Sequence, residues 1–146
     1  MTSPPLILVL SGPNLNRLGK REPEIYGTDS LDDIHSALEK QAETLGVTLS
    51  CRQSNHEGEL IDWLHEAEDQ GVKAVLLNAG GYTHTSVALR DAVASIATPV
   101  IEVHLSNPAA REEFRQTNLI TPVATGTVAG FGAHSYKLAL DAAARL

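Results

Sequence analysis

The chain has 146 residues, of which 42% are hydrophobic and 20% are charged, and its formal net charge is -7. This composition fits one globular domain with a sizeable core and excludes a disordered or fibrous protein. The acidic balance argues against nucleic acid or an anionic membrane as the main partner, because both require a basic face. Cys51 is the only cysteine, which excludes an internal disulfide and a multi-cysteine metal site. Without an apolar run that could span a bilayer or a start that resembles a signal peptide, we expect a cytoplasmic protein with a single domain over residues 1–146.

Short apolar runs rich in Val, Ile and Leu alternate with amphipathic stretches along the chain. The runs predict strands at Leu6–Leu10, Val47–Cys51, Val72–Leu77, Val100–Leu105 and, more weakly, near Val123–Val128. Helical spacing of apolar residues predicts four helices. They cover 31–45 after a cap at Asp29 or Ser30, the region around Leu60–Leu64 up to Gly71, a stretch that opens at Thr85 or Ser86 and ends before Pro99, and 136–146. This alternation predicts an α/β, flavodoxin-like three-layer sandwich, in which helices cover both faces of a five-stranded parallel sheet.

Polar segments follow four of the predicted strands. They are Ser11-Gly-Pro-Asn-Leu-Asn, Ser54-Asn-His-Glu-Gly, Asn78-Ala-Gly-Gly-Tyr-Thr-His and Glu102-Val-His-Leu-Ser-Asn. In open parallel sheets, ligands bind beyond the carboxyl ends of the strands. Any one of these segments could simply cap the next helix, but four at one edge indicate a binding or catalytic site.

The first predicted strand is followed by a long polar segment, Gly12–Gly27, whose length is typical of a lid or a binding loop. It contains Arg21 and Tyr26. A free tyrosine is a poor base at neutral pH, because its pKa is near about 10, and an adjacent arginine favours the phenolate. The pair could therefore form an activated general base. The residues alone favour a plainer interpretation, in which Tyr26 packs as a loop anchor and Arg21 pairs with a neighbouring glutamate.

Glu102 and His104 lie two residues apart on the predicted fourth strand and therefore on one face of it. The carboxylate could orient the imidazole and keep it protonated, as a general acid requires. A metal site that also uses His84 is an unfavoured alternative, because no closely spaced histidine pair supports it. Arg111 and Arg115 would share a face of a short helix, either to bind an anionic or hydroxyl-bearing substrate or, taken alone, as part of a solvated surface.

Phosphate-loop, dinucleotide-binding and nucleophile-elbow motifs are missing from the sequence. Five segments instead resemble, in order, the signature segments of type II dehydroquinases, from the first strand to the last helix. They are Gly12-Pro-Asn-Leu-Asn, Arg21-Glu-Pro-Glu-Ile-Tyr-Gly, Gln53-Ser-Asn-His-Glu-Gly, Asn78-Ala-Gly-Gly-Tyr-Thr-His-Thr-Ser and Glu102-Val-His-Leu-Ser-Asn. The chain departs from the family pattern at Ser11, where asparagine is common, and in the segments on either side of Arg115.

The resemblance implies a flavodoxin-like lyase that converts 3-dehydroquinate to 3-dehydroshikimate, in the shikimate pathway or in quinate breakdown, without a metal or cofactor. It implies that Tyr26 is the base and Arg21 holds it as phenolate, that Asn14 stabilises an enolate through a water, and that His104 is the acid oriented by Glu102. The remaining implied positions are Asn78, His84 and Arg115 for substrate hydroxyls, Leu105 (through its backbone N–H) and Ser106 for the carboxylate, and Asp91 for the site of a neighbouring subunit. The family commonly assembles as dodecamers built from trimers.

Two other functions remain open at this point. The first is a flavodoxin-like binding or regulatory module that senses a small polar ligand, which the polar strand ends alone would fit. The second is a related elimination on another cyclic hydroxy-acid. The Glu102–His104 pair and the segment with Arg21 and Tyr26 favour an enzyme, because a binding module needs no paired acid and base.

Overall fold

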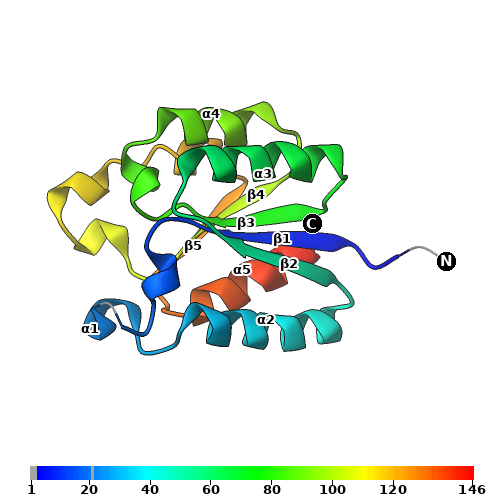
Figure 1. Cartoon of the computed structure of the whole chain (residues 1–146), viewed down its shortest axis with the longest axis horizontal. Helices are drawn as coiled ribbons and strands as arrows, with labels where there is room; N and C mark the ends of the chain where they lie inside the picture. The colour runs from blue at the N-terminus through cyan, green and yellow to red at the C-terminus, as the bar shows by residue number, and fades with distance from the viewer. Residues whose placement is uncertain (1–2, 21) are drawn as a thin grey trace.

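The computed structural model describes residues 3–20 and 22–146. Over these ranges the chain forms a five-stranded sheet with the strand order β2-β1-β3-β4-β5, and each neighbouring pair is parallel. The strands are β1 (Leu6–Ser11), β2 (Thr48–Gln53), β3 (Ala74–Asn78), β4 (Val100–His104) and β5 (Gly126–Ala129). The α-helices are α1 (Pro23–Tyr26), α2 (Leu31–Leu45), α3 (Glu57–Asp69), α4 (Val87–Ser95) and α5 (His134–Ala144). Helices α3 and α4 cover one face of the sheet and α2 and α5 the other, which confirms the predicted three-layer α/β fold (Figure 1).

Two apolar cores, one on each face of the sheet, stabilise the three layers. Because successive strand residues point to opposite faces, Ile7 and Val9 of β1 pack toward α2 and α5, whereas Leu8 and Leu10 pack toward α3 and α4. All four side chains are at most 4% exposed. Near-continuous apolar strands are typical of a parallel sheet that is covered on both faces.

Local capping explains where the helices begin. Ser30 accepts a hydrogen bond from the backbone N–H of Asp33, and the Asp33 carboxylate accepts one in return from the N–H of Ser30, so α2 starts with a complete capping box. Helix α4 starts after Ser86, whose hydroxyl accepts from the N–H of Leu89. Both starts agree with the predicted caps. No helix within the described ranges is long and apolar enough to cross a membrane.

The structure differs from the expected element pattern in two connections. The segment 12–27 is not an open loop, because it contains a 3-10 turn at Leu15–Arg17 and the short helix α1, and the buried Leu15 and Leu18 fasten it to the core. The last strand starts at Gly126, since Thr121–Val123 forms a 3-10 turn in place of the predicted strand start.

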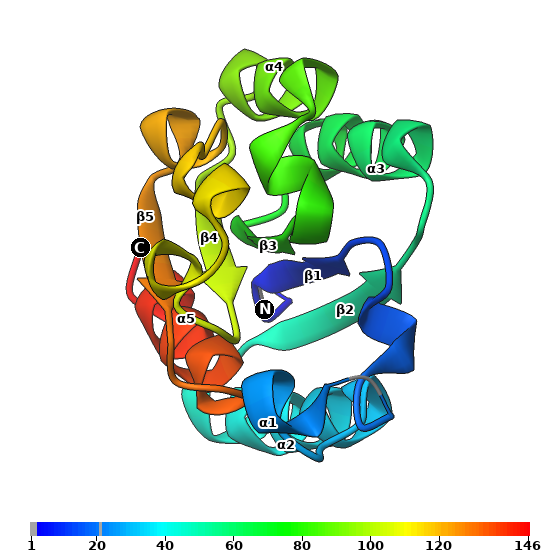
Figure 2. The same ribbon diagram turned by 90° about the vertical axis from the view of Figure 1, so that its left-hand side faces the viewer.

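The carboxyl ends of the strands meet at one end of the molecule. Figure 2 looks onto this end, where the short segments that follow β1, β3 and β4 surround the strand tips. Within the described residues, the remaining 3-10 turns are Gly80–His84, Pro108–Ala110 and Glu113–Gln116. This end therefore collects the polar segments that the sequence singled out.

Candidate active site

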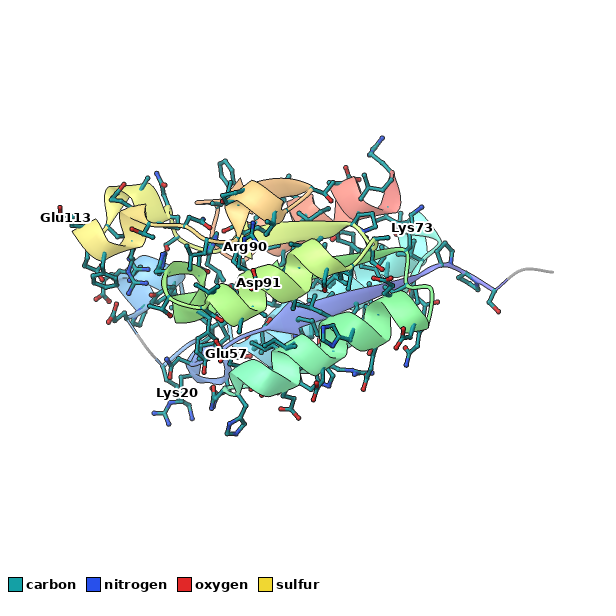
Figure 3. The ribbon with its side chains drawn as sticks, turned by 90° about the horizontal axis from the view of Figure 1, so that it is seen from above. Lys20, Glu57, Lys73, Arg90, Asp91 and Glu113 are labelled. Carbon is teal, nitrogen blue, oxygen red and sulfur yellow. The ribbon has the colours of Figure 1, made fainter. Side chains whose placement is uncertain are left out.

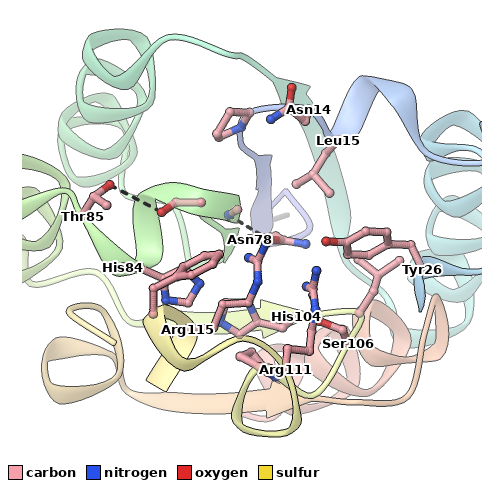
Figure 4. A pocket seen from close by; sticks show the side chains of 16 residues that line it. Asn14, Leu15, Tyr26, Asn78, His84, Thr85, His104, Ser106, Arg111 and Arg115 are labelled. Carbon is pink, nitrogen blue, oxygen red and sulfur yellow. Dashed lines mark hydrogen bonds between the residues drawn. The ribbon is translucent and has the colours of Figure 1, made fainter. Parts of the chain in front are cut away.

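A cavity of about 240 Å³ opens at the carboxyl ends of β1, β3 and β4. Eight of the predicted site residues line it: Asn14, Tyr26, Asn78, His84, His104, Leu105, Ser106 and Arg115. Tyr26 and His84 approach from opposite sides, with Asn78 and His104 between them (Figure 4). Three of the four polar strand ends thus form one cavity, whereas the segment Ser54-Asn-His-Glu-Gly after β2 does not line it.

Glu102 lies beneath this cavity, fully buried in the middle of the sheet. Each of its carboxylate oxygens accepts two hydrogen bonds. One oxygen accepts from the hydroxyls of Thr121 and Thr127, the latter at 3.0 Å, and the other accepts from the Asn118 amide at 2.7 Å and from His104 Nε2 at 2.5 Å. Burial alone raises the pKa of this carboxyl, but the hydrogen bonds from His104, Thr121 and Asn118 outweigh burial and lower the pKa to about 2. Glu102 is therefore a carboxylate at neutral pH.

His104 receives its orientation from this carboxylate. Side chains two residues apart on β4 share a face, so the imidazole lies directly against Glu102, as predicted. Because an ionised carboxylate only accepts hydrogen bonds, His104 Nε2 carries the proton of this bond. Nδ1 is then the nitrogen left for a ligand, and His104 is 7% exposed at the wall of the cavity.

Tyr26 ends helix α1 and is half-buried, with its ring packed against the core and its hydroxyl pointing into the cavity (Figure 4). The guanidinium carbon of Arg111 lies 5.0 Å from the centre of the Tyr26 ring. Arg111 also donates from Nη1 to the Ser106 hydroxyl at 3.1 Å. A positive charge thus faces the phenol and the predicted carboxylate-binding serine together.

Arg111 and Arg115 both reach the cavity, so the solvated-surface interpretation of this pair is wrong. Their side chains are only 13% and 16% exposed. The single short helix expected there is replaced by two 3-10 turns, with Arg111 between them. Glu112 sits outside and pairs with both guanidiniums, at 2.9 Å from Arg115 Nε and 3.5 Å from Arg111 Nε. It fixes the two arginines from the solvent side.

The loops after β1, β2 and β3 are tied together around Asn14. Its backbone is left-handed with φ 70°, a conformation in which asparagine is enriched, and its N–H donates to the Asn55 side chain at 2.9 Å. Gly12 crosses the end of β3 so closely that a Cβ on it would lie 2.8 Å from the carbonyl oxygen of Ala79. Its N–H donates to the Asn78 carbonyl at 2.8 Å. This contact sets the separation between the Asn14 and Asn78 walls of the cavity.

Asn78 and His84 are held by local backbone groups. The side-chain oxygen of Asn78 accepts from the N–H of Gly80 at 3.1 Å, which directs the amide nitrogen away from that turn. Nδ1 of His84 lies 2.7 Å from the carbonyl of Thr117, so it carries a proton and leaves Nε2 as the ring nitrogen for a ligand. Among residues 3–20 and 22–146, no three His, Cys, Asp or Glu side chains are grouped as they would be around a metal ion.

Comparisons with known proteins agree with this geometry. The family model described as "Dehydroquinase class II" matches residues 5–144. The chain belongs to the class II dehydroquinase family. A 3-dehydroquinate dehydratase of Caulobacter vibrioides is 59% identical over 94% of this chain and 93% of its own length. The crystal structure of type II dehydroquinase from Butyrivibrio crossotus superimposes with a TM-score of 0.95 at 41% identity, over 97% of this chain and 99% of the other. The predicted enzyme class, a type II dehydroquinase, is confirmed.

Two residues expected from the dehydroquinase resemblance, Glu102 and Asp91, do not line the cavity. Arg21 lies outside the described residues. Glu102 acts from beneath through His104. Asp91 lies on α4, on the outer surface, where its carboxylate pairs with Arg90 at 2.9 Å and its side chain is 60% exposed (Figure 3). Its expected role across a subunit boundary is compatible with this position and stays a prediction.

Arg111 and Phe114 also line the cavity, although neither is among the site residues that the dehydroquinase resemblance implies. Phe114 contacts the Arg115 guanidinium at 4.8 Å from its ring centre and meets the His84 ring edge-on at 6.3 Å between centres. The sequence did contain a signal for Arg111, since it was paired with Arg115 as a candidate. No pattern in the sequence pointed to Phe114, because a single aromatic residue in a charged segment is as common on a protein surface as in a binding site.

Proposed function

We propose that this chain removes water from 3-dehydroquinate to give 3-dehydroshikimate, with Tyr26 as the base and His104 as the acid. The observation that carries the assignment of roles is the placement of a phenol and a carboxylate-backed imidazole in one cavity, each fixed by other side chains. Membership of the dehydroquinase family and the names of its relatives support the reaction. The enzyme would act in the cytoplasm, in the shikimate pathway or in quinate breakdown.

The elimination proceeds through an enolate. Tyr26, as phenolate, takes a proton from the carbon next to the ketone, and the electrons of the broken C–H bond form the enolate. Asn14 stabilises the enolate through an ordered water. The enolate then expels the hydroxyl, which leaves as water with a proton from His104. Glu102 stays ionised throughout and stabilises the imidazolium before that transfer.

Substrate binding uses the remaining walls of the cavity. Ser106 and the N–H of Leu105 bind the carboxylate, next to the Arg111 guanidinium that already contacts Ser106. Asn78, His84 and Arg115 bind hydroxyls from the opposite wall. The two largely buried arginine side chains would let an acidic chain bind an anionic substrate, because a charge in direct contact outweighs the distant charges that make up the net charge.

A Tyr26→Phe variant tests the assignment of the base. Removal of the hydroxyl leaves the ring and its packing, so we expect binding of 3-dehydroquinate within a few-fold of wild type but a loss of kcat of about 10³-fold or more. Calorimetry reports the binding, and the rise in conjugated-enone absorbance reports the turnover. The wild-type rise should survive a chelator and borohydride, since the mechanism needs neither a metal nor a lysine imine.

Two results would contradict this function. Turnover in Tyr26→Phe close to the wild-type rate would remove Tyr26 as the base. Binding without any turnover by folded, assembled wild-type protein would favour the alternative of a binding module.

We also propose that Asp91 acts across an interface of a trimer-based dodecamer. Val87, one helical turn earlier on α4, is 61% exposed, so an apolar side chain stands next to the Asp91 carboxylate on the surface. We expect Asp91→Ala to lower kcat/KM about tenfold while sedimentation still shows the wild-type assembly. Full activity in a verified monomer would contradict the cross-subunit role.

A further inference from the structure

A buried hydroxyl network lies behind the Asn78 wall of the cavity. Tyr136, on the first turns of α5, has no exposed surface. Its hydroxyl oxygen lies 2.8 Å from Ser11 Oγ at the end of β1 and 3.2 Å from Asn78 Nδ2 at the end of β3. One phenol thus joins a helix to two strand ends, directly beneath a residue that faces the substrate.

The direction of the hydrogen bond between Asn78 and Tyr136 follows from the Asn78 amide. Its oxygen accepts from the Gly80 N–H, so the group that faces Tyr136 is the amide nitrogen, which can only donate. Tyr136 is then the acceptor of that bond. Its other partner is Ser11 Oγ, and either hydroxyl can donate in the bond between them.

The Tyr136 hydroxyl keeps its proton at neutral pH. Burial raises the pKa of Tyr136 to about 12, although the hydrogen bonds with Ser11 and Asn78 partly oppose that rise. The phenol therefore stays protonated at neutral pH, and its oxygen keeps accepting from the Asn78 amide. One N–H of the Asn78 amide is committed to Tyr136, and the other is the donor that remains for the cavity (Figure 4).

We propose that Tyr136 is a positioning residue for substrate recognition, which acts through Asn78 by fixing its amide so that a single N–H points at an oxygen acceptor of the substrate. This inference rests on the proposed function, because the acceptor is a hydroxyl or carboxylate oxygen of 3-dehydroquinate. Ser11 holds the Tyr136 hydroxyl from the other side, at 2.8 Å. The Tyr136 hydroxyl thus contributes to affinity although the substrate does not touch it.

Steady-state kinetics of Tyr136→Phe test this role. Loss of the hydroxyl frees the Asn78 amide to rotate, so KM should rise about five- to tenfold while kcat changes less than about twofold. Ser135→Ala is the matched control. It removes a buried hydroxyl from the neighbouring position of α5, which accepts from the Phe131 N–H and has no contact with Asn78, so its KM should equal that of wild type.

A double variant separates a positioning role of Tyr136 from a purely structural one. In an Asn78→Ala protein, a further Tyr136→Phe change should leave kcat/KM unaltered, because the amide through which the phenol acts is gone. If the two effects multiply, Tyr136 acts independently of Asn78 and the inference is overturned. Should Tyr136→Phe fail to fold, Ser11→Ala replaces it, and an unchanged KM in Ser11→Ala would equally overturn the inference.

The failure of the inference and the failure of the proposed function give different results. If wild-type protein turns over 3-dehydroquinate and Tyr136→Phe has the wild-type KM, only the positioning role is lost. If wild-type protein shows no turnover in the same assay, the proposed function fails and the positioning role fails with it.

Discussion

At the scale of single residues, the Glu102 carboxylate lies behind His104, the proposed acid, and outside the cavity. Four donors on Glu102 hold its carboxylate ionised, so it orients His104 without competing for the proton. Arg111 supplies positive charge close to Tyr26 and Ser106, and Arg115 adds a second guanidinium beside Phe114. His104 and Tyr26, the proposed acid and base, therefore each have neighbours that fix their orientation, as a preorganised site requires.

Arg111→Ala tests the importance of the charge next to Tyr26. The change removes the guanidinium over the ring and the hydrogen bond to Ser106, so kcat/KM should fall by about one to two orders of magnitude. Arg52→Ala is the matched control, because Arg52 also lies over an aromatic ring, at 5.5 Å from the centre of Trp63, but away from the cavity. Equal activity of both variants would exclude a role for the Arg111 charge.

Part of this residue-scale arrangement could be predicted from the sequence. The spacing of Glu102 and His104 on one strand predicted their contact, because strand periodicity alone determines it. The donors Asn118 and Thr121 could not be predicted, because they reach Glu102 only where the chain between Gln116 and β5 folds back toward β4, and no local pattern encodes that path. Thr127 lies opposite Glu102 in the pairing of β4 with β5, and this register depends on a last strand that the sequence indicated only weakly.

At the scale of elements, the longer helices could be predicted from local sequence patterns, whereas the short ones could not. The start of α2 combines a serine cap, an aspartate three residues later and an apolar periodicity, all of which are readable in sequence. Helix α1 and the 3-10 turns are only a few residues long, too short to show any periodicity. Buried leucines and contacts between loops determine them instead.

Ser30→Ala measures the value of the α2 cap. The change removes the hydroxyl that accepts from the Asp33 N–H and keeps the backbone N–H that donates to the Asp33 carboxylate, so the free energy of unfolding should fall by about 1 kcal/mol. For a chain of this length, that loss lowers the melting temperature by about 3 °C. Ser36→Ala, on the exposed face of the same helix, should not lower the melting temperature below that of the wild type. If both variants melt at the wild-type temperature, the cap does not stabilise the helix.

At the scale of the whole molecule, the parallel sheet brings together at one edge residues that are distant in sequence. The same sheet buries Glu102 between two apolar cores, so a group that serves the cavity also contributes to global stability. Its pKa is about 2 in the folded chain against an ordinary value of 4.5. The stabilisation is therefore complete above about pH 4.5 and is lost as the pH falls toward 2.

Unfolding at several pH values measures this linkage. The free energy of unfolding of the wild type should decrease steeply between pH 4.5 and 2, whereas Glu102→Gln should start lower and decrease less, because its amide does not titrate. Glu66→Gln, which changes an exposed carboxylate on α3, should keep the wild-type slope. Parallel curves for wild type and Glu102→Gln would show that Glu102 is not the group responsible.

The close crossing of Gly12 over Ala79 has a consequence for how this sequence can diverge. Any side chain at position 12 would push apart the two loops that carry Asn14 and Asn78, since the neighbouring carbonyl oxygen already stands 2.8 Å from where a Cβ would be. Substitution of Gly12 is therefore expected to be harmful because of this contact alone, since the φ angle at Gly12 is one that other residues also adopt. Gly12 therefore fixes the distance between the two walls of the cavity, and relatives that bind the same substrate are expected to keep a glycine at this position.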